Sequence, residues 1–181
     1  MNIYLMRHAT TRWNELGITQ GHTHNRLSKT SIELTNKLSD DFKNTQIDLI
    51  ITSPLMRSVQ TSNIMNKHHN VKIIKDNRLI DIDQGIFSRT KFAKLSEEKK
   101  QMRLNRVPEA KLEPYQSVYK RTKNFYLDMI NTYKDKNILI ITHTINASLL
   151  ELLINDIEVD YDNPIHLRNF KNAEMKTFKI C

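Results

Sequence analysis

Cysteine is nearly absent from this chain: the only one among 181 residues is the last, Cys181. A lone cysteine can form no disulfide within the chain, and it excludes a metal site built from several cysteines. Residues 1–7 have neither the basic start nor the long apolar stretch of a signal peptide, so we expect a cytoplasmic location. No apolar run reaches the roughly 18 residues that a membrane span needs, so no membrane partner is expected.

Glycine is scarce as well, with 3 residues where about 7% of the chain would be usual. Hydrophobic residues make up 39%, which is low but enough for a soluble core, so wholesale disorder is not expected. The length matches one ordinary domain, and no repeat or linker rich in glycine, serine or proline divides the chain. We therefore expect a single domain over residues 1–181.

Acidic residues are outnumbered by lysine and arginine, 20 to 28, which gives a net charge of +8. The chain is also rich in asparagine and isoleucine and poor in alanine, so the surplus charge can reflect a coding bias spread over the surface. A nucleic-acid surface and the attraction of anionic small molecules are the alternatives. Because the sequence shows no recognisable nucleic-acid-binding module and no basic–aromatic stripe, we expect no nucleic-acid partner.

Short apolar runs alternate with segments of helical periodicity along most of the chain. The runs that predict strands are residues 3–6, 49–51, 71–74 and 138–141, with an alternating edge strand at 175–180. Helices are predicted at 32–42, from Ser53 as N-cap through 65, at 90–106, at 118–133 and around 149–153. This order predicts an α/β fold, a three-layer αβα sandwich with a mostly parallel sheet and helices on both faces.

Basic and imidazole side chains stand at the ends of three predicted strands. Arg7 and His8 follow the first strand, Ser53 and Arg57 follow the second, and His143 follows the fourth. The carboxyl ends of parallel strands meet at one edge of a sheet, where ligands bind in such folds. The sequence therefore predicts two histidines and two arginines in one site.

These side chains suit phosphoryl transfer. Arginines bind phosphate oxygens through paired N–H groups, and a neutral histidine nitrogen can attack phosphorus. Neighbouring cations favour that neutral form near pH 7 and offset charge on the transferred oxygens. Each histidine could instead be structural, and His8 with His143 could bind zinc, although Arg7 would oppose a cation there. We expect no metal and no resident cofactor.

Several short motifs resemble those of the histidine phosphatase superfamily, also called phosphoglycerate mutase-like. They are Leu5-Met6-Arg7-His8-Ala9-Thr10-Thr11 with Trp13-Asn14, then Gln20-Gly21, Ser53-Pro54-Leu55-x-Arg57-x-x-Gln60-Thr61, Leu79-x-Asp81 with Gly85 and Phe87, Glu113 with Val118 and Arg121, and the strand 138–142 with His143. The motifs stand in the family's order and span nearly the whole chain, so their joint occurrence is specific.

The resemblance implies a two-step reaction through a phosphohistidine on His8. Arg7, Arg57 and His143 would hold the transferred oxygens. The further positions that the resemblance assigns to phosphate or substrate binding are Asn14, Gln20, Gly21 and Thr144. The substrate implied is a small phosphorylated metabolite.

A carboxylic acid would protonate the leaving oxygen and then activate water. The family usually has Glu at the position of Asp81, and aspartate can move the same proton although it is one methylene shorter. Asp83 is the nearby alternative, but the motif register favours Asp81.

At three places in the family's motifs, this chain carries other residues where the family has glycine. Ala9 follows the expected nucleophile, Ser88-Arg89 replaces a Glu-Gly pair, and Thr144-Ile145 replaces Gly-Gly. Glycine allows a positive φ or a close backbone approach. Its loss after His143 is expected to shift the backbone donor there.

The short chain favours a hydrolase. Mutases of this family are typically longer, because insertions exclude water from the phosphohistidine. Mutase-type transfer and a weakly active or non-catalytic phospholigand-binding descendant are the alternatives. Residues 90–112 are expected to cover the site, and their basic side chains could attract a polyanionic substrate or form a solvated helix face. The sequence leaves the substrate and the oligomeric state, monomer or homodimer, open.

Overall fold

A five-stranded sheet forms the centre of the computed structural model, which describes residues 1–161, 167 and 169–180 and so leaves Cys181 outside. The strands are β1 (Asn2–Arg7), β2 (Leu49–Thr52), β3 (Lys72–Lys75), β4 (Ile138–Thr142) and β5 (Met175–Lys179). Their order is β3-β2-β4-β1-β5. The pairs β3–β2, β2–β4 and β4–β1 are parallel, whereas β5 runs antiparallel beside β1. The mostly parallel sheet and its edge strand are as predicted.

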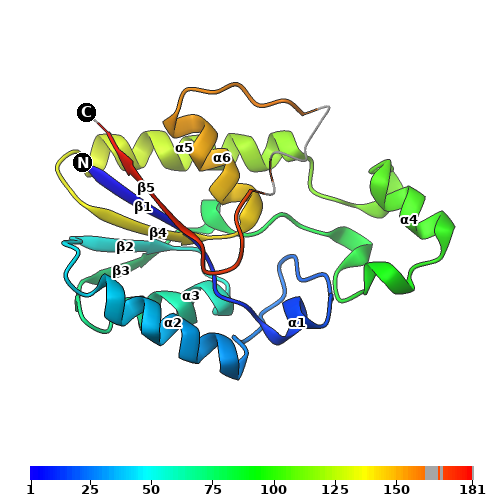
Figure 1. Cartoon of the computed structure of the whole chain (residues 1–181). Helices are drawn as coiled ribbons and strands as arrows, with labels where there is room; N and C mark the ends of the chain where they lie inside the picture. The colour runs from blue at the N-terminus through cyan, green and yellow to red at the C-terminus, as the bar shows by residue number, and fades with distance from the viewer. Residues whose placement is uncertain (162–166, 168, 181) are drawn as a thin grey trace.

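Helices lie on both faces of this sheet, with α5 and α6 on one face and α2 and α3 on the other (Figure 1). The α-helices are α1 (Arg12–Glu15), α2 (Lys29–Phe42), α3 (Met56–Met65), α4 (Glu97–Leu104), α5 (Tyr115–Thr132) and α6 (Thr144–Ile154). The 3₁₀ helices are η1 (Asn77–Leu79), η2 (Gly85–Phe87), η3 (Phe92–Lys94) and η4 (Pro108–Ala110). In the described part of the chain, no helix is long and apolar enough to cross a membrane. The architecture is the predicted three-layer αβα sandwich.

Alternate residues of the central strands enter two different hydrophobic clusters. Ile138 and Ile140 of β4 pack in the cluster that contains Phe125 of α5. Leu139 and Ile141 of the same strand pack in the cluster on the side of α2 and α3. All four strand residues are fully buried, and each contributes about 1.5–3 kcal/mol through burial. Burial on both faces explains why the strands read as continuous apolar runs.

The helix after β2 begins later than predicted. Its first residue is Met56, its N-cap is Leu55, and no side chain caps it. The prediction of Ser53 as N-cap is therefore wrong. The Ser53 hydroxyl instead lies 2.8 Å from Nε2 of His143, across 90 residues of sequence, and accepts from the Leu55 N–H at 3.3 Å, so it caps no N–H within α3.

The helix predicted at 90–106 is also shorter in the structure. The α4 helix covers Glu97–Leu104, and the Ser96 hydroxyl caps it by accepting from the Lys99 N–H at 3.4 Å. Beyond α4, Arg106 takes a φ of 49°, which ends helical backbone. None of the α4 residues is buried, and Figure 1 shows the helix set apart from the sheet.

Gly85 allows two loops to meet below α4. Its φ is +49°, and a Cβ there would lie 2.1 Å from the Ala110 carbonyl oxygen and 2.4 Å from that of Lys111. Both atoms are backbone, so neither can give way cheaply. Only glycine therefore lets the loop that follows η1 contact the end of the 90–112 segment.

Candidate active site

The register of the parallel strands brings the two predicted catalytic histidines together. Arg7 of β1 is paired with Thr142 of β4, and the His8 backbone N–H donates to the Thr142 carbonyl at 2.9 Å. His8 and His143 therefore follow neighbouring strands at the same level, and their ring centroids are 5.1 Å apart. Ser53 follows β2, and its hydroxyl lies 2.8 Å from Nε2 of His143. The three strand ends meet as predicted.

The hydrogen bond of His8 determines which of its nitrogens carries the proton. Nδ1 lies 2.8 Å from the carbonyl oxygen of Ala9. A carbonyl oxygen can only accept, so Nδ1 donates and Nε2 keeps its lone pair. Burial lowers the pKa of His8 well below its ordinary value, and the charges of Arg57 and Arg7 lower it further. His8 is therefore neutral at pH 7, in the form that a nucleophile requires.

His143 is equally buried, and both of its ring nitrogens meet protein groups. The Arg57 Nε–H donates to Nδ1 at 3.3 Å, which leaves the proton on Nε2 to be donated to the Ser53 hydroxyl. Burial, followed by the charge of Arg57, lowers the pKa of His143 well below its ordinary value. Oδ2 of Asp81 lies 3.7 Å from Nδ1 of His143, so the carboxylate and the imidazole are close neighbours.

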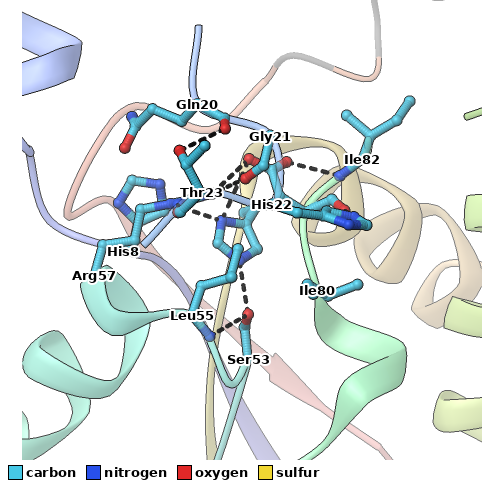
Figure 2. Close-up of polar contacts among 12 residues, drawn as sticks. His8, Gln20, Gly21, His22, Thr23, Ser53, Leu55, Arg57, Ile80 and Ile82 are labelled. Atoms are coloured by element: carbon cyan, nitrogen blue, oxygen red, sulfur yellow. Dashed lines mark hydrogen bonds and ion pairs between the residues drawn. The ribbon is translucent and has the colours of Figure 1, made fainter. Parts of the chain in front are cut away.

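Arg57 binds several residues of the site at once. Its side chain is fully buried, and its terminal nitrogens donate to the carbonyls of Thr23 at 2.8 Å and Gly21 at 2.9 Å and to Oδ2 of Asp81 at 2.8 Å (Figure 2). Burial lowers its pKa, although Asp81 opposes that shift. Arg57 does not line the cavity. It fixes Asp81 and His143 relative to the loop through Gly21.

Arg7 differs from Arg57 because one of its donors has no acceptor. Nη1 donates to the Phe170 carbonyl at 2.8 Å. Its Nε is buried and, among the residues that the structure describes, has no hydrogen-bond partner. A buried N–H without an acceptor is destabilising by about 1–3 kcal/mol. Arg7 lines the cavity, where an oxyanion would supply the missing acceptor.

Eight of the nine predicted site residues line one cavity of about 800 Å³. They are Arg7, His8, Asn14, Gln20, Gly21, Asp81, His143 and Thr144. Thr144 is the first residue of α6, whose first-turn N–H groups favour anions. Oδ1 of Asn14 accepts from the Thr11 backbone N–H at 3.0 Å, and Oε1 of Gln20 accepts from the Thr11 hydroxyl at 3.0 Å, which holds the two amides at the wall.

A half-buried arginine outside the cavity holds the loop that carries Asp81. Arg121 of α5 donates to the carbonyls of Arg78 at 2.7 Å, Ile80 at 2.6 Å and Asp81 at 3.2 Å. Glu113 accepts two hydrogen bonds from Arg121, at 3.0 Å and 3.1 Å. Both residues belong to the predicted motifs, but their spacing gave no role. The structure shows that they fix the backbone of the loop around Asp81.

The second candidate carboxylate, Asp83, has a different task. Its Oδ1 accepts from the Gly85 N–H at 2.9 Å, and its own N–H donates to Glu113 at 3.0 Å. Asp83 does not line the cavity.

Sequence reasoning also missed His22, whose Nε2 lies 2.8 Å from the Asp81 carbonyl. Residues 80–84, which carry both aspartates, belong to no helix or strand.

The replaced family glycines differ in their backbone requirements. Ala9 has no positive φ, is fully buried, and donates its N–H to the Thr61 hydroxyl at 3.0 Å. Thr144-Ile145 forms the first turn of α6, where helical backbone suits any residue. Arg89, in contrast, has a φ of 68°, which costs a non-glycine residue about 1–3 kcal/mol. The conformational need for glycine therefore persists at Arg89 and not beside the histidines.

A zinc ion bound by His8 and His143 would need further ligands. Within residues 1–161, 167 and 169–180, no group of three or more histidine, cysteine, aspartate or glutamate side chains could hold a metal ion. The two histidines instead face Ala9, Arg57 and Ser53.

Comparison with known proteins agrees with this geometry. The model of the histidine phosphatase superfamily (branch 1) matches residues 3–179. The chain belongs to this superfamily. Phosphoserine phosphatase 1 of Hydrogenobacter thermophilus is 26% identical over 197 aligned positions, which cover 100% of this chain and 93% of the relative. A protein named Probable phosphoglycerate mutase GpmB, of Cronobacter sakazakii, is 26% identical over 93% of this chain and 81% of its own length.

The fold is likewise that of solved superfamily structures. The alpha-ribazole phosphatase from Shigella flexneri superposes with a TM-score of 0.86 and 21% sequence identity, covering 100% of this chain and 91% of that chain. These matches confirm the resemblance and the predicted fold class. Together with the named phosphatases, they support an enzyme of the superfamily.

Burial of the two neutral histidines makes the stability of this superfamily member depend on pH. Their pKa values are lowered in the folded state, so below about pH 6.5 the unfolded chain binds protons that the folded chain does not. The free energy of unfolding should therefore fall with decreasing pH, by up to about 1.4 kcal/mol per pH unit for each histidine. Denaturant unfolding at pH 7.5 and pH 5.5 measures the loss.

The matched controls for this measurement replace one histidine at a time. His8→Asn should show a smaller loss between the two pH values, whereas replacement of the exposed His24 by Asn should leave the loss unchanged. If the free energy of unfolding fell by the same amount in wild type and in His8→Asn, His8 would not be the source of the pH dependence.

Proposed function

We propose that the chain is a phosphomonoester hydrolase that acts on a small phosphorylated metabolite through a phosphohistidine on His8. The observation that carries the proposal is the pairing of a neutral His8, with its lone pair on Nε2, and Arg7, whose buried Nε lacks an acceptor among the described residues. A phosphoryl group in the cavity would give Nε2 its electrophile and Arg7 its acceptor.

The first step forms a bond between His8 Nε2 and phosphorus while the bond from phosphorus to the leaving oxygen breaks. The Asp81 carboxyl donates its proton to that oxygen, which leaves as an alcohol. His143, whose ring centroid lies 5.1 Å from that of His8 and which lines the same cavity, would contact the transferred oxygens. Arg57 and Arg7 supply positive charge to the transferred group as it moves.

The second step releases phosphate. The Asp81 carboxylate takes a proton from a water molecule, whose oxygen attacks phosphorus as the bond to Nε2 breaks. His8 returns to its neutral form, and Asp81 is again protonated for the next cycle. Asp81 lines the cavity and lies 3.7 Å from Nδ1 of His143, which supports it as the group that moves these protons.

A mutase reaction is the second candidate, because a relative carries the name of a phosphoglycerate mutase. A mutase must keep water away from the phosphohistidine until an acceptor hydroxyl arrives. The α4 helix in the segment proposed as the cover has no buried residue, which favours the hydrolase.

A panel of phosphomonoesters tests the proposed function. The wild-type protein should release inorganic phosphate from 4-nitrophenyl phosphate and from several metabolite esters without added metal. Phosphate itself should raise the Tm because it binds only the folded state. Absence of phosphate release across the panel, with an isomerised ester as product, would favour the mutase. Stabilisation by phosphate without any turnover would point to a non-catalytic binding protein.

A further inference from the structure

One wall of the cavity comes from the segment that was expected to cover the site. We call this the cover wall, and its residues are Phe92, Arg103, Leu104, Arg106, Leu112 and Tyr115. The 90–112 segment carries basic residues at several positions, but only two arginines line the cavity, whereas Lys91, Lys94, Lys99 and Lys100 do not. The positive charge on the cover wall therefore comes from two arginines in particular and not from the many lysines of the segment.

The cavity is larger than a phosphoryl group requires. A volume of about 800 Å³ is in the range of pockets that enclose drug-sized ligands. Leu104, Leu112 and Tyr115 supply apolar surface on the cover wall, and Ile18 and Ile145 add more from other segments. The leaving group that fits this space has an apolar body.

The charges of the lining also discriminate between leaving groups. Among the described residues, Asp81 is the only carboxylate that lines the cavity, and it is paired with Arg57 at 2.8 Å. A substrate ammonium group would find no other acid there, and it would lie near two cationic side chains. An anionic group on the leaving side would instead meet Arg103 and Arg106.

Both arginines are held in place by neighbouring groups. Arg103 donates to the Thr19 hydroxyl at 3.0 Å and to Oε1 of Gln84 at 3.1 Å, and its guanidinium lies 5.5 Å from the Phe92 ring centroid. Arg106 lies 4.2 Å from the ring centroid of Tyr115 and donates to the Glu113 carbonyl. A positioned guanidinium loses less entropy when it binds an anion.

We propose that the substrate is a phosphomonoester whose leaving group carries a second anionic group on an apolar body. The second anion binds Arg106 and Arg103, and the apolar body lies against Leu104, Leu112 and Tyr115. This inference rests on the proposed function, since it describes the leaving side of the same cavity. It sets this chain apart from a phosphatase for an amino-acid phosphate, whose ammonium group has no acceptor on the cover wall.

A matched pair of aryl phosphates tests the inference. In 3-(carboxymethyl)phenyl phosphate and its methyl ester, the phenol has nearly the same leaving ability and only the remote charge differs. The wild-type protein should prefer the free acid by about 10–100-fold in kcat/KM. Arg106→Gln should bring the ratio of the two kcat/KM values close to one, and Arg103→Gln should lower it. Lys99→Gln removes a cover charge that does not line the cavity and should leave the ratio unchanged.

The outcomes separate this inference from the proposed function. Hydrolysis of both compounds at equal kcat/KM would overturn the inference and leave the hydrolase intact. If neither compound were hydrolysed, calorimetric binding of the uncleaved pair would still decide, because a Kd ratio of one contradicts the inference and a Kd preference for the acid that Arg106→Gln abolishes supports it. Faster hydrolysis of O-phosphoserine than of the free acid would also contradict it.

Discussion

His8→Ala should lower the hydrolysis of aryl phosphates by roughly 10³-fold or more, because it removes the proposed nucleophile. The chemical basis is the hydrogen bond from Nδ1 to the Ala9 carbonyl, which leaves the Nε2 lone pair available, and the lowered pKa that keeps the ring neutral. No other assigned residue can replace a lost nucleophile, since the ring nitrogens of His143 already meet Arg57 and Ser53.

Two measurements check this result. Steady-state release of phosphate from 4-nitrophenyl phosphate gives the rate. Rapid quenching of the wild-type protein during turnover of a substrate with a labelled phosphoryl group should trap on the protein an acid-labile phosphate that is missing in His8→Ala. His68→Ala is the matched control, because that histidine is exposed and pairs with Asp40 at 2.6 Å on the surface. Undiminished turnover by His8→Ala would refute the mechanism.

Asp81→Asn should slow the reaction by an amount that depends on the leaving group. General acid catalysis contributes about 10²–10⁴-fold when the leaving oxygen is strongly basic, as in an alkyl phosphate. A nitrophenolate leaves without a proton, so 4-nitrophenyl phosphate should lose much less. The ratio of kcat/KM for the two substrates in one protein preparation is the measurement.

The ratio also separates chemistry from stability in this variant. Asparagine leaves the fully buried Arg57 without its carboxylate partner, so Asp81→Asn is expected to lower the free energy of unfolding as well. A smaller folded fraction lowers both rates equally and cannot change their ratio. Asp83→Asn is the control, since its carboxylate accepts from Gly85 outside the cavity lining and its loss should affect both substrates alike. Equal slowing of both substrates by Asp81→Asn would count against its acid role.

Most of the framework of the site could be predicted from the local sequence. Strands such as Ile138–Thr142 are buried on both faces, so they read as uninterrupted apolar runs, and the residue after each parallel run lies at the edge of the sheet. That reasoning placed His8, His143 and Ser53 together without knowledge of any contact. The helix predicted at 118–133 is found as α5, and Val118, Thr122, Phe125 and Met129 of this helix are all buried.

The sequence did not predict contacts that depend on residues far apart in the chain. Ser53 is a good N-cap by residue type, but its hydroxyl binds His143, so α3 begins at Met56 instead. Arg57 likewise makes contacts that its position in the sequence does not reveal, because its side chain donates to Asp81, Gly21 and Thr23. Neither outcome can be read from neighbouring residues, because each depends on which groups the folded chain brings within about 3 Å.

By itself the sequence determined the sandwich, the edge of the sheet that carries the site and the kinds of side chain gathered there, because apolar periodicity and strand ends are local properties of a chain. Tertiary structure decided the rest. It selected Nε2 of His8 as the nitrogen with a lone pair, Asp81 over Asp83 as the carboxylate at the cavity, and Arg103 and Arg106 among the basic residues of the 90–112 segment. Hydrogen-bond direction, burial and cavity lining depend on distances between segments far apart in the chain, and only the folded arrangement specifies those distances.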